Sequence, residues 1–115
     1  MEGRSPGVSR PDRQDVRQAR VKVVLSPRAE LDFETQVRWL AAHSPSAGRA
    51  AALKIVETID LLVEFPDIGL AVHGGCREKQ VQFGRDGFVI RYRRTGDAVI
   101  ILRIFHGRQD RQGAN

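Results

Sequence analysis

The sequence has little cysteine and no long apolar run. Cys76 is the single cysteine of the 115-residue chain, so neither an internal disulfide nor a cysteine metal cluster is expected. No apolar stretch approaches the roughly 20 residues that span a bilayer, and the charged N-terminus lacks the apolar segment of a secretory signal. We therefore expect a protein of the reducing cytoplasm that does not enter a membrane.

General catalytic signatures are also missing. The glycine-containing turns GRDG and HGGC lack the longer fixed spacings of a Walker loop or a dinucleotide fingerprint. The three histidines (His43, His73 and His106) are not spaced as metal ligands, so we expect neither a metal site nor a cofactor. A nucleophilic pair of Cys76 with His106 is conceivable, but no local pattern supports it.

Positive charge is concentrated in the C-terminal third of the chain. The net charge is +5, and residues 76–115 hold nine basic and four acidic groups. Residues 21–75 instead hold five basic and seven acidic groups. This asymmetry favours an anion-seeking face in the C-terminal part, although arginines that only solubilise sheet edges would give the same count.

Hydrophobic periodicity predicts one α+β domain in the order β-α-α-β-β-β. Ser26 and Pro27 are typical of a helix start, and a second helix capped by Ser46 follows after a short connection. The predicted strands are residues 21–25, 77–83, 88–94 and 98–106, and the predicted helices run to His43 and Phe65. We expect the helical hairpin to pack on one face of a mainly antiparallel sheet, with the other face only partly covered.

The ends of the chain are predicted separately from the domain. Residues 1–20 contain two prolines, two glycines and almost no large apolar side chains, which predicts a disordered leader. Residues 21–110 are predicted to form the folded domain, and residues 111–115 a flexible tail.

Both helices are predicted to be amphipathic. The first presents an apolar face made of Ala29, Leu31, Phe33, Val37, Leu40 and Ala41, with Trp39 near its edge. The second presents Ala51, Ile55, Ile59, Leu62 and Val63, with Leu53 and Val56 widening the stripe. The acidic side chains Glu57, Asp60 and Glu64 are expected to face water rather than to act as catalytic carboxylates.

A hairpin at residues 86–110 carries the candidate chemistry. Its second strand is apolar except for Arg103, as expected of a central strand covered on both faces. If the strand registers bring Arg77, Arg91 and Arg103 together, their guanidinium groups could hold phosphates, while His106 could transfer a proton near neutral pH. The alternative is that Arg77 pairs with an acidic helix residue and that His106 merely ends the strand. We favour this alternative over nuclease chemistry. We nevertheless favour a functional role for these basic residues as a binding surface.

These segments resemble the ParE/RelE superfamily of bacterial type II toxin–antitoxin toxins, and ParE in particular. The resemblance covers about residues 21–110 and rests on the order and spacing of VVLSPRAELDFE, the loop FPDIG, Cys76-Arg77-Glu78, the strand FVIRYRR and the ending ILRIFHGRQD. It implies the same fold and a growth-inhibiting toxin that is neutralised by a small antitoxin encoded beside it.

The resemblance implies two alternative targets. ParE-like members typically poison DNA gyrase, whereas RelE-like members cleave mRNA on the ribosome with basic residues and a Tyr or His acid/base group. In that ribonuclease alternative the catalytic residues would be Arg77, Arg91, Arg103 and His106, with Tyr92 as a further candidate. The sheet half has Lys79 as its single lysine and no tyrosine after Tyr92, which favours gyrase poisoning. A third alternative is an inactive antitoxin-binding module.

The leading interpretation is therefore a non-enzymatic toxin with two binding surfaces. We expect the target to contact Arg77, Lys79, Arg91, Arg93, Arg103, His106 and Arg108. We expect the antitoxin to cover the helical hairpin or the sheet groove through Leu31, Val37, Trp39 and Leu40. No cofactor, metal or membrane partner is expected.

Overall fold

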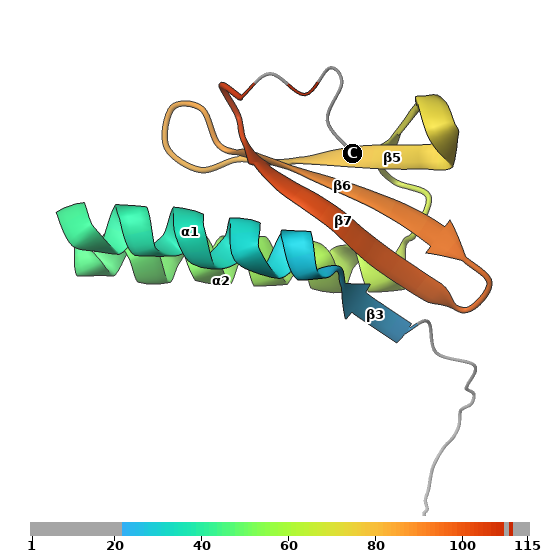
Figure 1. The fold of residues 1–115 in the computed structure, drawn as a ribbon, viewed down its shortest axis with the longest axis horizontal. Helices are drawn as coiled ribbons and strands as arrows, with labels where there is room; N and C mark the ends of the chain where they lie inside the picture. The colour runs from blue at the N-terminus through green and yellow to red at the C-terminus, as the bar shows by residue number, and fades with distance from the viewer. Residues whose placement is uncertain (1–21, 110, 112–115) are drawn as a thin grey trace, which may run out of the picture.

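The computed structural model describes residues 22–109 and 111, which form a helical hairpin packed on one sheet (Figure 1). The elements are β3 (Lys22–Leu25), α1 (Pro27–His43), α2 (Pro45–Glu64), β4 (Leu70–Val72), a short 3-10 helix (His73–Gly75), β5 (Cys76–Val81), β6 (Phe88–Thr95) and β7 (Ala98–His106). The five-stranded sheet has the order β3-β7-β6-β5-β4, in which β3 runs parallel to β7 and the other pairs are antiparallel. The predicted α+β class is confirmed. The leader predicted for residues 1–20 lies outside the described residues.

Serine caps begin both helices. The Ser26 hydroxyl accepts a hydrogen bond from the Ala29 amide at 3.0 Å, and a proline follows it at the first helical position, as predicted. The prediction that Ser46 caps the second helix was wrong. The Ser44 hydroxyl accepts from the Ala47 amide at 3.3 Å, and Pro45 occupies the first helical position. Because a proline needs no donor there, α2 begins directly after Ser44.

The hydrophobic core lies between the helices and the sheet. Its buried members are Ala29, Ala51, Ile55, Ile59, Leu62, Val81, Phe88, Ile90, Tyr92, Val99, Ile101 and Ile104. Leu31, Leu53 and Val56 do not belong to it, contrary to their predicted place on the apolar faces, since they are 55%, 60% and 45% exposed. Leu53 precedes Ile55 by two residues, which is about 200° around a helix axis, so the two side chains point in nearly opposite directions.

One short strand was not predicted. Strand β4 pairs with β5 through residues 70–72, in the stretch that was predicted as a loop. Gly74 and Gly75 both have positive φ values, of 79° and 75°, which let the chain turn back onto β5. The strand has three residues, too few for a recognisable alternation of side chains. Strand β5 ends at Val81 rather than at residue 83, and residues 82–87 form a loop.

Helix α1 completes the edge of β7. Strand β3 pairs only with residues 98–101 of β7, so the rest of that edge has no neighbouring strand among the described residues. Polar side chains of the helix bond to it instead: Ser26 Oγ donates to the Leu102 carbonyl at 3.0 Å, and Gln36 Nε2 donates to the Ile104 carbonyl at 2.6 Å. The Asp32 carboxylate accepts from the Ile104 amide at 2.9 Å. The helix therefore takes the place of a strand.

Candidate functional site

The sheet separates the predicted arginine cluster into two faces. In the register, Arg77 pairs with Tyr92 and Arg91 pairs with Arg103. Neighbouring residues along a strand point to opposite faces, and Tyr92 belongs to the core beneath the helices. Arg77 therefore lies on the helical side, whereas Arg91 and Arg103 share the other face with Phe105. The structure brings together two of the three arginines and not the third.

Arg91 is held by a carboxylate on the neighbouring strand. Its Nε and Nη2 atoms donate to Glu78 Oε2 at 3.0 Å and 2.8 Å. Arg111, beyond the end of β7, reaches the other oxygen of Glu78 with its Nε at 3.2 Å, and its carbonyl accepts from Arg91 Nη2 at 3.3 Å. Glu78 thus joins the sheet to the C-terminal segment, because one carboxylate pairs with both Arg91 and Arg111.

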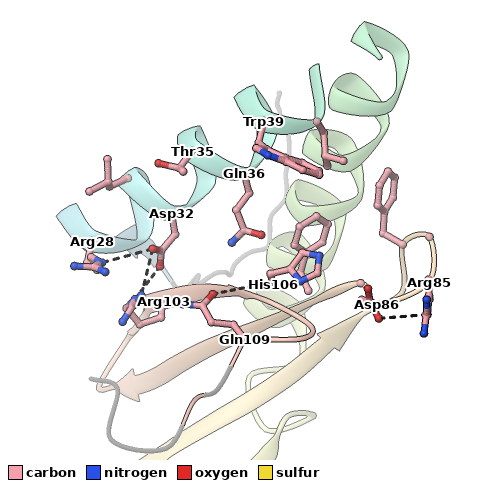
Figure 2. A pocket seen from close by; sticks show the side chains of 16 residues that line it. Arg28, Asp32, Thr35, Gln36, Trp39, Arg85, Asp86, Arg103, His106 and Gln109 are labelled. Carbon is pink, nitrogen blue, oxygen red and sulfur yellow. Dashed lines mark hydrogen bonds and ion pairs between the residues drawn. The ribbon is translucent and has the colours of Figure 1, made fainter. Parts of the chain in front are cut away.

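Arg103 is held by a carboxylate of helix α1. Its Nε donates to Asp32 Oδ2 at 2.8 Å and its Nη2 to Asp32 Oδ1 at 3.4 Å (Figure 2). The guanidinium carbons of Arg91 and Arg103 lie 4.9 Å and 4.7 Å from the centroid of the Phe105 ring, which is itself fully buried. With Arg91 8% and Arg103 7% exposed, both cations are enclosed between carboxylates and an aromatic ring. This arrangement stabilises the sheet.

Arg77 and Tyr92 hold the loop that follows α2. The Tyr92 hydroxyl donates to the Pro66 carbonyl at 2.7 Å and accepts from the Gly69 amide at 2.9 Å. Arg77 Nη1 donates to the Gly69 carbonyl at 2.8 Å, and its guanidinium lies near the Asp67 carboxylate. Burial raises the pKa of Tyr92, and the bond from the Gly69 amide partly offsets the rise. Arg77 thus pairs with a loop carboxylate rather than with the helix residue named in the alternative interpretation.

The remaining basic residues lie at two ends of the sheet. Arg93 is exposed, and its Nη2 donates to the Gly74 carbonyl at 2.8 Å, while Lys79 is half-buried on β5. At the opposite end, the exposed His106 is the last residue of β7 and the exposed Arg108 follows it by two residues, with its Nε 3.9 Å from Asp86 Oδ2. The seven predicted target contacts therefore do not form one continuous patch.

The His106 ring has one nitrogen already engaged. Its Nδ1 accepts a hydrogen bond from the Arg108 backbone amide at 3.2 Å, and its edge contacts Phe88 with the ring centroids 6.3 Å apart. This bond turns the Nδ1 side of the ring toward the backbone of Arg108.

A glycine brings the β5–β6 loop against the end of β7. A Cβ at Gly107 would collide with the Asp86 carbonyl oxygen, and the Gly107 amide donates to the Gly87 carbonyl at 2.9 Å. Gly87 itself has a positive φ of 65°. The sequence His-Gly-Arg was interpreted through its charged residues, but its glycine is what allows this close approach.

Held in this position, the β5–β6 loop forms one wall of a groove of about 620 Å³ (Figure 2). Helix α1 forms the other wall, and the floor is the end of β7. Apolar side chains in its lining are Leu31, Trp39, Leu40, Phe83 and Phe88, and the charged or polar ones include Arg28, Arg85, Asp86, His106 and Gln109. Three of the four residues predicted to bind an antitoxin line this groove. Val37 does not. The loop residues were missed, because no local pattern shows that they face α1.

No group of three or more potential metal ligands occurs within residues 22–109 and 111. In the same part of the chain, neither helix combines the length and apolarity needed to cross a bilayer.

Comparison with known proteins identifies the family. The family model described as "ParE toxin of type II toxin-antitoxin system, parDE" matches residues 23–111. The chain belongs to the ParE toxin family. It is 36% identical over 89 residues to "Toxin RelE1" and 38% identical over 89 residues to "Toxin RelE3", both of Caulobacter vibrioides. Each match covers 77% of this chain, and 96% and 97% of those toxins, respectively.

A solved structure shares the fold of this ParE-family toxin. It is titled "Chromosomal ParDE TA system from P. aeruginosa", and it superimposes with a TM-score of 0.64 at 20% identity. The match covers 77% of this chain and 98% of that one. Membership of the family makes the chain the toxin of a type II toxin–antitoxin system and implies an antitoxin as its partner.

Proposed function

We propose that this toxin inhibits growth by poisoning DNA gyrase, as a stoichiometric ligand rather than as a nuclease. The observation that carries the proposal is the pairing of Arg91 with Glu78 and of Arg103 with Asp32. A phosphate transition state needs cations whose charge is directed at it. These two cations are instead buried and directed at carboxylates of the protein itself, as expected of residues that hold a sheet together.

His106 is compatible with either role. A general base must accept a proton with a free lone pair, and a general acid must hold a proton near its pKa. In this structure the Nδ1 of His106 is engaged by the Arg108 amide, which leaves Nε2 as the ring nitrogen that could transfer a proton. His106 is also exposed at the rim of the groove, where it can contact a protein partner.

The groove fits an antitoxin segment with an apolar side. Trp39 and Leu31 are 62% and 55% exposed on one wall, and an unpartnered apolar surface of this kind is typical of a protein interface. A segment seated there would also cover His106 and Arg85, which line the same groove. We propose that the antitoxin neutralises the toxin in this way, by covering residues that the target must reach.

The gyrase proposal is tested with purified full-length toxin, gyrase, ATP and relaxed plasmid. We expect loss of supercoiling and protein-linked linear DNA that appears after detergent and protease treatment. Arg108→Glu should weaken both effects on the order of tenfold, because it reverses an exposed charge just after the end of β7. Arg38→Glu, on a side chain 79% exposed outside the groove lining, is the matched control. Unchanged supercoiling at saturating wild-type toxin would exclude this gyrase as the target.

Cleavage of mRNA on the ribosome is the second candidate function. Exposure of His106 beside Arg85 and Arg108 favours it, since a ribosome could realign these groups. His106→Ala separates the two functions: an endonuclease would lose about 100-fold or more of its cleavage rate, whereas a gyrase ligand would lose far less affinity. A wild-type protein that neither poisons gyrase nor cleaves mRNA would favour the third alternative, an inactive antitoxin-binding module.

A further inference from the structure

Helix α2 carries apolar side chains on its solvent-exposed side, where packing within the domain does not require them. Leu53, Val56 and Leu61 are 60%, 45% and 39% exposed on the side of the helix opposite the core. None of the α2 residues lines the groove formed by the described part of the chain. The apolar side chains on this face therefore contribute neither to the core nor to the groove.

The charges on the same face are divided by sign between the two halves of the helix. Arg49 and Lys54 lie in the first half of α2, whereas Glu57, Asp60 and Glu64 lie in the second half, and all five are exposed. A helix favours acidic groups near its N-terminus and basic groups near its C-terminus. The first turn of α2 contains no acidic residue and its last turn no basic one.

These charges are also unpaired within the described part of the chain. The ion pairs of residues 22–109 and 111 include none of the five charged side chains. Asp60 and Glu64 are four residues apart, so these like charges are neighbours on the helix surface and repel each other. The outer face of α2 thus has a basic first half and an acidic second half, and an antiparallel second copy of the same face would complement this order of charges.

We propose that the outer face of α2 docks against the same face of a second copy of this chain, with the two helices antiparallel. A two-fold axis near Val56 and Glu57 places Arg49 of each copy opposite Glu64 of the other. Leu53 then lies within the contact, opposite the acidic half of the other copy's helix. The basic half of one helix meets the acidic half of its partner, and the two helix dipoles oppose each other favourably.

The proposed contact is small. Helix α2 has 20 residues and is about 30 Å long. One helix pair buries less than the roughly 800 Å² per partner that is typical of stable complexes, so we expect a dissociation constant between about 1 µM and about 1 mM. The groove stays open in this dimer, which leaves α1 accessible to an antitoxin.

Sedimentation equilibrium of the full-length chain tests the proposal across a concentration series reaching about 1 mM. We expect a monomer–dimer equilibrium for the wild type. Arg49→Glu and Glu64→Arg should each weaken it on the order of tenfold, because each places like charges opposite one another twice. An equimolar mixture of the two variants should restore dimerisation, since a mixed pair has opposite charges at both positions. Leu53→Asp should weaken the dimer at any salt concentration.

The controls make the outcome decisive. Glu64→Arg removes an acid from the last turn of α2, and Arg49 and Glu64 are both exposed, so neither variant should lower the melting temperature appreciably. Glu34→Arg changes an exposed acid of α1 and should leave the equilibrium unchanged. A wild-type chain that stays monomeric throughout the series would overturn the proposal. A dimer that is insensitive to the α2 variants, or not restored by mixing them, would overturn it as well, because such a dimer forms through another surface.

Discussion

Single residues on the face of the sheet that carries Phe105 show how this protein surrounds an aromatic ring with paired charges. Phe105 is fully buried, and the guanidinium groups of Arg91 and Arg103 lie over its ring. Each cation is in turn fixed by a carboxylate, Glu78 or Asp32. Loss of either carboxylate would leave a cation enclosed without its counter-charge, which is far more costly than loss of an exposed pair.

The Asp32→Asn variant tests this directly. We expect it to lower the free energy of unfolding by about 3 kcal/mol, because a buried ion pair loses one partner. The amide oxygen can still accept from the Ile104 amide, so the loss reports mainly on Arg103. The measurement is urea unfolding followed by circular dichroism. Glu34→Gln on the same helix, in a pair with 63% and 79% exposed side chains, should cost less than about 0.5 kcal/mol. Equal losses would mean that the Arg103 pair contributes no more than a surface pair.

Because of Tyr92, the free energy of unfolding should depend on pH in the alkaline range. Burial raises its pKa above the ordinary value of 10.0, so the folded state favours the protonated phenol. The resulting stability is fully present below pH 10.0 and is lost as the pH rises through the folded-state pKa. Tyr92→Phe should cost about 1–3 kcal/mol at neutral pH, since the Gly69 amide loses its acceptor. The difference between the two proteins in thermal unfolding should shrink above pH 10; a constant difference would contradict the raised pKa.

At the scale of elements, sequence patterns predicted most of the structure. The limits of β7 and the start of α1 were correct, because turn residues, caps and alternation are local. The role of the α1 polar side chains was not predictable in the same way. Asp32 and Gln36 have the spacing of a solvated helix face, but they bond to Ile104 on a strand far along the chain. Only the three-dimensional fold shows that this edge of β7 lacks a neighbouring strand among the described residues.

Contact between the β5–β6 loop and β7 depends on one glycine. Gly107→Ala would drive a methyl group into the Asp86 carbonyl, so the loop must shift. We expect a loss of about 1–3 kcal/mol in unfolding free energy and weaker antitoxin binding, because the loop forms one wall of the groove. Thermal unfolding and affinity for the co-purified antitoxin measure the two effects. Arg108→Ala, at the neighbouring exposed position, should leave stability within about 0.5 kcal/mol of the wild type. A fully stable Gly107→Ala variant would show that the loop adapts freely.

On the scale of the whole molecule, function depends on surfaces that no single element provides. The sequence predicted that Leu31, Trp39 and Leu40 bind an antitoxin, since they are apolar residues on one helix. It could not predict that Phe83 and Arg85 lie opposite them, because a glycine contact between distant segments determines the position of that loop. The same limit applies to the arginines: a sequence shows their number, whereas the fold determines which carboxylates neutralise them.

The groove should therefore separate neutralisation from toxicity. Trp39→Ala removes a side chain that is 62% exposed at the groove, and we expect antitoxin affinity to fall about 10- to 100-fold, as for an aromatic residue at the centre of an interface. Cells that express this variant with the antitoxin should stop growing at antitoxin levels that protect against the wild type. Leu53→Ala is the matched control, because Leu53 is 60% exposed but lies outside the groove lining, and its neutralisation should be normal. If both variants are neutralised as well as the wild type, the antitoxin binds elsewhere.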